Sequence, residues 1–173
     1  MDDAADNALP TSPRALLARF GELGLACTTV EHAPLHTVEE SRALRGGIPG
    51  QHCKTLFLKD KKGTLWLVVV AEDRRLDMKS LARRIGAARL SFGKPDLLWR
   101  ILGVHPGAVT PFALINDGEI RVKVVLDKAM LEARLLNYHP LVNTATTTLE
   151  AMDLKKFIAS CGHRPQIVDL DAP

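Results

Sequence analysis

The sequence predicts an α+β domain in which a mixed, largely antiparallel β-sheet is flanked by helices. Pairs of apolar, strand-like segments joined by short turns outnumber strand-helix-strand repeats along the chain, which favours this class over a doubly wound sheet. The 173 residues are 46% hydrophobic and 25% charged, which is typical of one globular domain with a substantial core. We therefore expect a flexible acidic tail at residues 1–11 and one domain at residues 12–173.

The first elements are predicted from capping signals. Ser12 and Pro13 supply an N-cap and a first-turn proline to an amphipathic helix. A strand is expected at residues 26–32. Thr37 and Glu40 then form a capping box, which opens a short helix that ends at a glycine pair.

The centre of the sheet is predicted from two strongly apolar segments. Residues 54–60 and 64–71 are separated by a short turn that ends in glycine, so they are expected to form a hairpin. Two helices should follow, at residues 77–85, with Asp77 as the N-cap, and at residues 95–102.

The remaining elements are predicted from one strong turn signal and from periodicity. Asn116-Asp117-Gly118 is flanked by apolar residues, which predicts a second hairpin between residues 109–116 and 119–126. Periodicity then predicts a helix, a threonine-rich strand, an amphipathic helix and a last strand, at residues 127–133, 143–149, 152–160 and 166–170.

Charge is unevenly distributed along the chain. Residues 74–100 carry eight basic and two acidic side chains, a net +6, whereas the whole chain is only +3. Such a concentration suits a polyanion such as a nucleic-acid backbone, although it also fits the solvated faces of two helices.

Several function classes are disfavoured. The apolar runs are too short to span a bilayer and the N-terminus is acidic, so we expect a cytoplasmic protein with no membrane contact. The three cysteines are widely spaced and form no CxxC pair, which indicates neither a disulfide framework nor a zinc site. We expect no metal and no cofactor. The motifs GxSxG, HExxH, GxxxxGK[ST] and GxGxxG do not occur.

Lys54 is the most informative single residue. The two-residue period of a strand places it on the same face as Leu56 and Leu58, where an ammonium is costly unless a partner compensates it. It either has a functional partner or lies at the strand end and reaches water. The adjacent His52 and Cys53 point to opposite faces, so they do not form a base and nucleophile pair.

Two further segments are rich in groups that could hold a ligand. Residues 139–147 concentrate hydrogen-bonding side chains at the entry of a strand, a pattern that also occurs on solvent-facing edges. Residues 103–111 contain two glycines and two prolines, and backbone amides in such a loop could approach a carbonyl or a phosphate.

In order and spacing, these segments together resemble the YbaK-like, prolyl-tRNA synthetase-associated editing domains. Lys54 in an apolar strand, a GxxxP pattern at residues 107–111, the Asn116-Asp117-Gly118 turn and the His139-Pro140-Leu141-Val142-Asn143-Thr144 segment carry the resemblance. It covers residues 20–170 and is strongest for the free-standing branch that acts on alanyl-tRNA(Pro), known as ProXp-ala. The resemblance implies the fold of that family and a hydrolase that removes a wrongly attached small amino acid from tRNA(Pro).

The resemblance also implies roles for individual residues. Lys54 matches the lysine central to deacylation. Substrate-binding positions are expected at Thr55, Gly107, Ala108, Val109, Thr110, Pro111, His139, Asn143 and Thr144. The basic stretch is expected to contact the acceptor stem and CCA end of tRNA(Pro) through Arg83, Arg84 and Arg89, and prolyl-tRNA synthetase is a further candidate partner.

A mechanism and its rivals follow from these assignments. An aminoacyl ester needs little beyond a positioned water and stabilisation of the oxyanion, which Lys54 and the amides of residues 107–111 could supply. Leu56, Ile48 and Val142 are candidates to line the pocket. Thr55 stands where the alanine-specific branch often has asparagine, so a cysteinyl-tRNA(Pro) deacylase remains an alternative. A non-catalytic module that binds tRNA or the synthetase is the alternative of another class.

Overall fold

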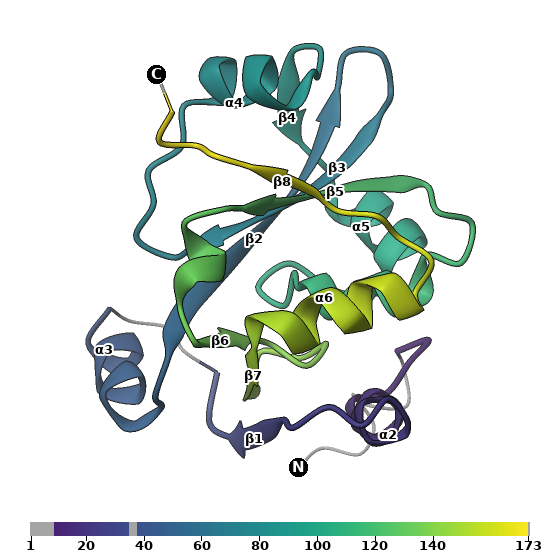
Figure 1. Ribbon diagram of the computed structural model, residues 1–173. Coiled ribbons are helices and arrows are strands. Elements are labelled where there is room, and N and C mark those ends of the chain that lie inside the picture. The colour runs from purple at the N-terminus through teal and green to yellow at the C-terminus, as the bar shows by residue number, and fades with distance from the viewer. Residues whose placement is uncertain (1–8, 35–37, 173) are drawn as a thin grey trace.

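The computed structural model describes residues 9–34 and 38–172, and Figure 1 shows their arrangement. The helices, with the two short 3-10 helices written η, are α2 (Pro13–Glu22), α3 (Val38–Gly47), α4 (Met78–Ile85), α5 (Pro95–Leu102), η1 (Pro111–Asn116), η2 (Met130–Glu132) and α6 (Ala151–Ser160). The strands are β1 (Thr28–Glu31), β2 (Gln51–Asp60), β3 (Leu65–Ala71), β4 (Leu90–Phe92), β5 (Val122–Asp127), β6 (Leu135–Tyr138), β7 (Ala145–Glu150) and β8 (Gln166–Val168).

The described strands form one mixed sheet in the order β1-β7-β6-β2-β3-β5-β8, and β4 pairs with β2. Four of the pairings between described strands are antiparallel and three are parallel. The predicted fold class is therefore confirmed. The long strand β2 pairs with β3 along one edge, while its other edge pairs with β6 at residues 51–52 and with β4 at residues 58–60.

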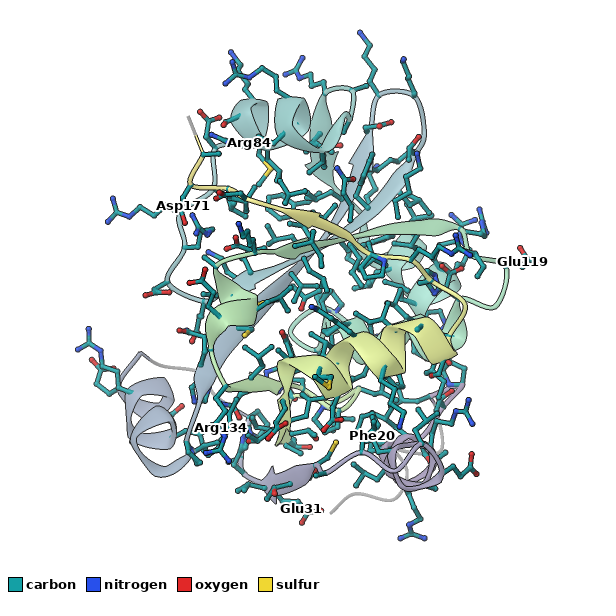
Figure 2. The ribbon with its side chains drawn as sticks, in the orientation of Figure 1. Phe20, Glu31, Arg84, Glu119, Arg134 and Asp171 are labelled. Atoms are coloured by element: carbon teal, nitrogen blue, oxygen red, sulfur yellow. The ribbon has the colours of Figure 1, made fainter. Side chains whose placement is uncertain are left out.

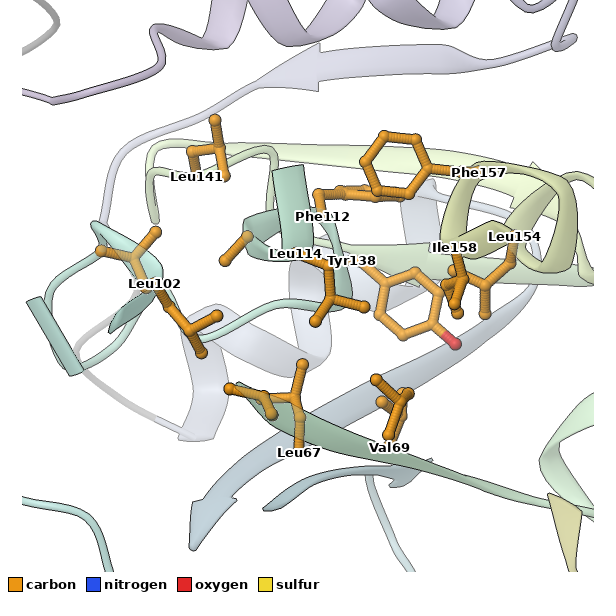
Figure 3. Close-up of a cluster of buried hydrophobic side chains, with 14 of the residues drawn as sticks. Leu67, Val69, Leu102, Phe112, Leu114, Tyr138, Leu141, Leu154, Phe157 and Ile158 are labelled. Atoms are coloured by element: carbon orange, nitrogen blue, oxygen red, sulfur yellow. The ribbon is translucent and has the colours of Figure 1, made fainter. Parts of the chain in front are cut away.

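Alternation along the central strands separates two apolar cores. Phe57, Leu67 and Val69 face the larger core, which α2, α5, η1 and α6 cover. Leu58 and the alternate residues of β3 face a smaller core beneath α4. Figure 3 shows part of the larger core, in which Phe112 and Phe157 meet edge to face with ring centroids 5.5 Å apart.

Local signals placed most helices correctly. The hydroxyl of Ser12 accepts from the Ala15 amide, 3.1 Å away, and Asp77 accepts from the Lys79 amide at 3.0 Å. The helix predicted from the Thr37 capping box is present as α3, although Thr37 itself lies outside the described residues. None of the helices in the described ranges is long and apolar enough to cross a membrane.

The predicted hairpin around Asn116-Asp117-Gly118 is wrong. Pro111–Asn116 forms η1, not a strand, and β5 pairs in parallel with β3 and β8. The Asp117 carboxylate accepts from the amides of Arg121 and Val122, both at 3.0 Å, and lies 2.9 Å from Nε2 of His163. A buried carboxylate needs hydrogen-bond partners. The Asp117 carboxylate finds them in these two amides and in the distant His163, and these contacts hold the turn.

Other boundaries also differ from prediction. The helix predicted at residues 127–133 shrinks to η2, and the strands β4 and β6 were not predicted. Residues 1–8 of the predicted flexible tail lie outside the described residues. After them, Leu9 packs against the larger core and the Thr11 hydroxyl donates to Oδ1 of Asn116 at 2.6 Å.

Candidate functional site

The segment that contains His139 is the loop between β6 and β7. These strands pair antiparallel, with Tyr138 opposite Thr147, so residues 139–144 connect them at one end of the sheet. Leu141 in this loop has φ of +72° and is only 2% exposed. A non-glycine residue in the left-handed region costs about 1–3 kcal/mol and persists only where its surroundings hold it. The loop therefore has a defined shape.

His139 is held as a neutral hydrogen-bond acceptor. Its Nδ1 lies 2.8 Å from the carbonyl oxygen of Ala145. Because a carbonyl only accepts, Nδ1 carries the proton and Nε2 presents a lone pair. Burial lowers the pKa of His139 below its usual 6.5, and the nearby His32 acts in the same direction. The imidazole is thus suited to accept a proton or a hydrogen bond near neutral pH.

A second histidine lies beside the first. The rings of His32 and His139 have centroids 6.3 Å apart, and Nε2 of His32 lies 2.8 Å from the Thr146 hydroxyl. The His32 amide also donates to the Thr144 carbonyl at 2.8 Å. His32 ends the predicted first strand, but nothing in the sequence indicated that this strand pairs with β7.

A small cavity of about 70 Å³ opens beside His139. Its lining comes from α3, β2, the end of β3, β6 and β7, and consists of Leu44, His52, Cys53, Glu72, Asn137, Tyr138, His139 and Thr146. A shallower hollow of about 500 Å³ shares His52 and Glu72 with it and is otherwise lined by Gly50, Gln51 and Asp73. The cavity is large enough for a group of a few heavy atoms. Ile48, Leu56 and Val142, the candidates to line the amino-acid pocket, are not among the residues that line this cavity.

The GxxxP loop lies against the His139 loop. A Cβ added to Gly107, whose φ is +90°, would lie 3.6 Å from Nδ2 of Asn143. Ala108 is buried and Val109 packs against the larger core. The buried Thr110 caps η1 by accepting from the Phe112 amide at 3.3 Å, and Pro111 begins that helix. The structure thus brings together two segments that are about 30 residues apart.

Lys54 is not among the residues that line this cavity. As predicted, it lies on the Leu56 and Leu58 face of β2, and the residue is half-buried. Its Nζ donates to the carbonyl oxygen of Arg74 at 2.6 Å. It shares this face with His52, two residues earlier on β2, which lines the hollow. The ammonium therefore has a structural partner near the site but not in the cavity.

The residues on either side of Lys54 face the larger core. Cys53 lines the cavity, and burial raises its pKa to about 12. A thiol with such a pKa is protonated at neutral pH and is a poor nucleophile. Thr55 is half-buried on the same face and stands opposite Val69 of β3.

The predicted tRNA-binding residues fall into two groups. The side chains of Arg83 and Arg89 are exposed. Arg84 instead donates to the carbonyl oxygens of Asp169 and Ala172, and Figure 2 shows it beside the C-terminal segment. Arg74, also in the basic stretch, is paired with Asp127 and Asp171. Part of the basic charge therefore holds the chain end in place.

The chain thus combines a mixed sheet flanked by helices with a small cavity beside His139 and exposed basic side chains at Arg83 and Arg89. The model of the aminoacyl-tRNA editing domain family matches residues 32–157. The chain belongs to that family, as the sequence motifs predicted.

Relatives support the same conclusion. The chain is 35% identical to the prolyl-tRNA editing protein ProX of Acetoanaerobium sticklandii over 158 residues, which covers 91% of this chain and 96% of that protein. It is 38% identical to prolyl-tRNA synthetase associated domain-containing protein 1 of Bos taurus over 163 residues, 91% and 94% of the two chains. A crystal structure attributed to a trans-editing enzyme for prolyl tRNA synthetase has the same fold, with a TM-score of 0.69 at 20% identity and coverage of 91% and 96%.

Proposed function

We propose that the protein hydrolyses mischarged alanyl-tRNA(Pro) to free alanine and tRNA(Pro) in the cytoplasm. The observation that carries this proposal is the cavity of about 70 Å³ beside His139. It is far smaller than the roughly 300–1,000 Å³ of ordinary ligand pockets. A methyl side chain fits such a space easily, whereas the three ring carbons of a correctly attached proline would fill it, so we take side-chain size as the basis of discrimination. Steric exclusion of a larger group discriminates better than the small gain from added methylenes.

The reaction adds water to the ester carbonyl and breaks the bond between the carbonyl carbon and the ribose oxygen, which takes up a proton. An ammonium has three N–H donors, and the Arg74 carbonyl uses one of those of Lys54. We assign the other two to the developing oxyanion, together with the amides of Gly107 and Val109, because the Ala108 amide already donates to the carbonyl oxygen of His105 at 3.1 Å. Stabilisation of this kind typically contributes about 10²- to 10³-fold in rate per donor.

His139 orients the attacking water in this mechanism. Its Nε2 is the acceptor left by the bond from Nδ1 to Ala145, so it receives a hydrogen bond from water in the neutral state. Asn143 and Thr144, in the same loop, are assigned to the aminoacyl group and the terminal ribose, and Thr55 to the cavity side of β2. No covalent nucleophile is required.

The tRNA partner is proposed to contact the protein through its acceptor stem and CCA end. Arg83 and Arg89 are exposed and suit phosphate contacts. We assign Arg84 a smaller contribution to phosphate binding, because its guanidinium already donates to the carbonyl oxygens of Asp169 and Ala172. Prolyl-tRNA synthetase, which produces the mischarged tRNA, is the proposed second partner.

The test is a deacylation panel with alanyl-, cysteinyl- and prolyl-tRNA(Pro). We expect rapid loss of alanine, intact prolyl-tRNA, and a fall of about 10²-fold or more for Lys54→Ala. Lys155→Ala, an exposed lysine on α6, is the matched control and should retain full activity.

The other outcomes separate the rivals. If cysteine were released from tRNA(Pro) faster than alanine, the protein would be a cysteinyl-tRNA(Pro) deacylase. Salt-dependent binding of tRNA with every ester left intact would identify a non-catalytic module.

A further inference from the structure

Two hollows flank the short strand β4, at the far end of the molecule from α3 and β1 (Figure 1). One, of about 720 Å³, lies between β4, the end of β2 and α5. The other, of about 1010 Å³, lies between β4 and α4. Both are lined in part by Arg89 and Leu90, so they form one continuous surface around the strand. We call this surface the β4 ridge.

The β4 ridge is strongly cationic. Its lining includes seven exposed basic side chains, Lys59, Lys61, Lys79, Arg83, Arg89, Lys94 and Arg100. None of the seven forms an ion pair with another residue in the described part of the chain. The positive charge of the ridge is therefore not neutralised within the protein and can attract an anionic ligand.

The carboxylates of the ridge offset little of this charge. Asp60 is 5% exposed and accepts from the Trp66 indole and from the amides of Lys62, Thr64 and Ala88. Asp77 caps α4. Asp77 and Asp96 are the two exposed acidic side chains among the residues that line the ridge, against seven exposed basic ones.

An exposed aromatic side chain lies among these cations. Phe92 ends β4 and is 63% exposed, although the residue opposite it on β2, Leu58, is fully buried. A Cβ at Gly93 would lie 2.6 Å from the ring of Phe57, so this glycine allows the chain to leave β4 directly beside Phe92. A single exposed apolar residue is ordinary on a protein surface. An aromatic ring framed by cations is the arrangement that binds unpaired nucleotides, which stack on the ring while their phosphates contact Lys and Arg.

We propose that the β4 ridge binds an unpaired segment of RNA, with a base stacked on Phe92 and the phosphates along the seven basic side chains. Lys59 lies seven positions after His52 on β2, which separates the two residues by about 23 Å at roughly 3.3 Å per residue. The ridge therefore contacts nucleotides well removed from the ester in the His139 cavity. This inference rests on the proposed function in one respect, which is that the bound RNA is taken to be the substrate tRNA.

The first experiment measures binding of uncharged tRNA(Pro) and of a single-stranded RNA oligonucleotide by filter assay. Phe92→Ala should weaken binding about 5- to 150-fold, and Phe92→Trp should restore it. Met152→Ala, which removes a 77% exposed apolar side chain from α6, is the control and should leave binding unchanged. Lys94→Ala should lower the slope of log K against log salt concentration by about 1, whereas Lys155→Ala should not.

The second experiment separates this inference from the proposed function. An alanine ester of adenosine fills the cavity but is too short to reach Phe92, so Phe92→Ala should hydrolyse it normally, while Lys54→Ala should not. If wild type hydrolyses neither this ester nor alanyl-tRNA(Pro) but still needs Phe92 for RNA, the proposed function fails and the ridge assignment stands. If Phe92→Ala binds RNA as Met152→Ala does, the ridge assignment is overturned. Loss of self-association or of synthetase binding, with RNA binding intact, would overturn it in favour of a protein interface.

Discussion

The pair between Arg74 and Asp127 is expected to stabilise the fold far more than the pair between Arg74 and Asp171. Asp127 is fully buried and bonds Nε of Arg74, whereas the side chain of Asp171 is 64% exposed. Asp127→Asn places an amide N–H group or a weaker acceptor against the guanidinium of Arg74, whose side chain is only 18% exposed. Breaking a buried pair costs about 3–5 kcal/mol, while an exposed pair contributes about 0–1 kcal/mol.

Thermal unfolding provides the assay. For a chain of this size about 1 kcal/mol shifts Tm by roughly 2–4 °C. Asp127→Asn should therefore lower Tm by about 6–20 °C, and the matched control Asp171→Asn by less than about 4 °C. Because the Arg74 carbonyl holds Nζ of Lys54, any folded Asp127→Asn protein should also lose deacylation. Equal Tm values for the two variants would refute the reasoning.

Three further predictions follow from the site and its supports. Burial lowers the pKa of His139 in the folded protein below the 6.5 of the unfolded chain, so its neutral form stabilises the fold fully above pH 6.5, and this stabilisation is lost as pH falls through the folded pKa. Deacylation should fall over the same pH range. In a His139→Asn protein, the residual activity should no longer decrease with pH in this range. Iodoacetamide at pH 8 should neither label Cys53 quickly nor abolish activity, because burial raises the pKa of this thiol to about 12; rapid inactivation that Cys53→Ala prevents would contradict this. Gly50→Ala should lower the urea midpoint, since φ is +106° and the new Cβ would lie 2.8 Å from Cβ of Leu135, whereas Gly46→Ala in α3 should not.

Elements with local signals could be predicted from the sequence. The caps at Ser12 and Asp77 set the starts of α2 and α4, and the turn at Gly63 joins β2 to β3. In contrast, Pro111–Asn116 is a short apolar run, which periodicity cannot distinguish from a buried strand. Strand β6 was missed because it is only four residues long, which is too short for a clear alternation of apolar and polar residues. Its pairing with the distant strand β2 is also not visible in the local sequence.

The candidate site shows the same division. His139, Asn143 and the GxxxP loop were singled out from residue types and spacing. Their neighbours His32 and Glu72 were not, because the lining of the cavity comes from several elements that meet only in the folded sheet. Phe92 carried no signal in the sequence, since its exposure depends on where β4 ends beside α5.

By itself, the sequence determined the fold class, the family and the apolar face that carries Lys54, because these depend on composition, motif order and the two-residue period of a strand. Only the tertiary structure decided that the Lys54 ammonium bonds the Arg74 carbonyl and that Cys53, not Lys54, lines the cavity. It also decided which arginines hold the chain end and which remain exposed. The physical reason is that hydrogen bonds and burial belong to atoms brought together by long-range pairing, which local sequence patterns do not specify.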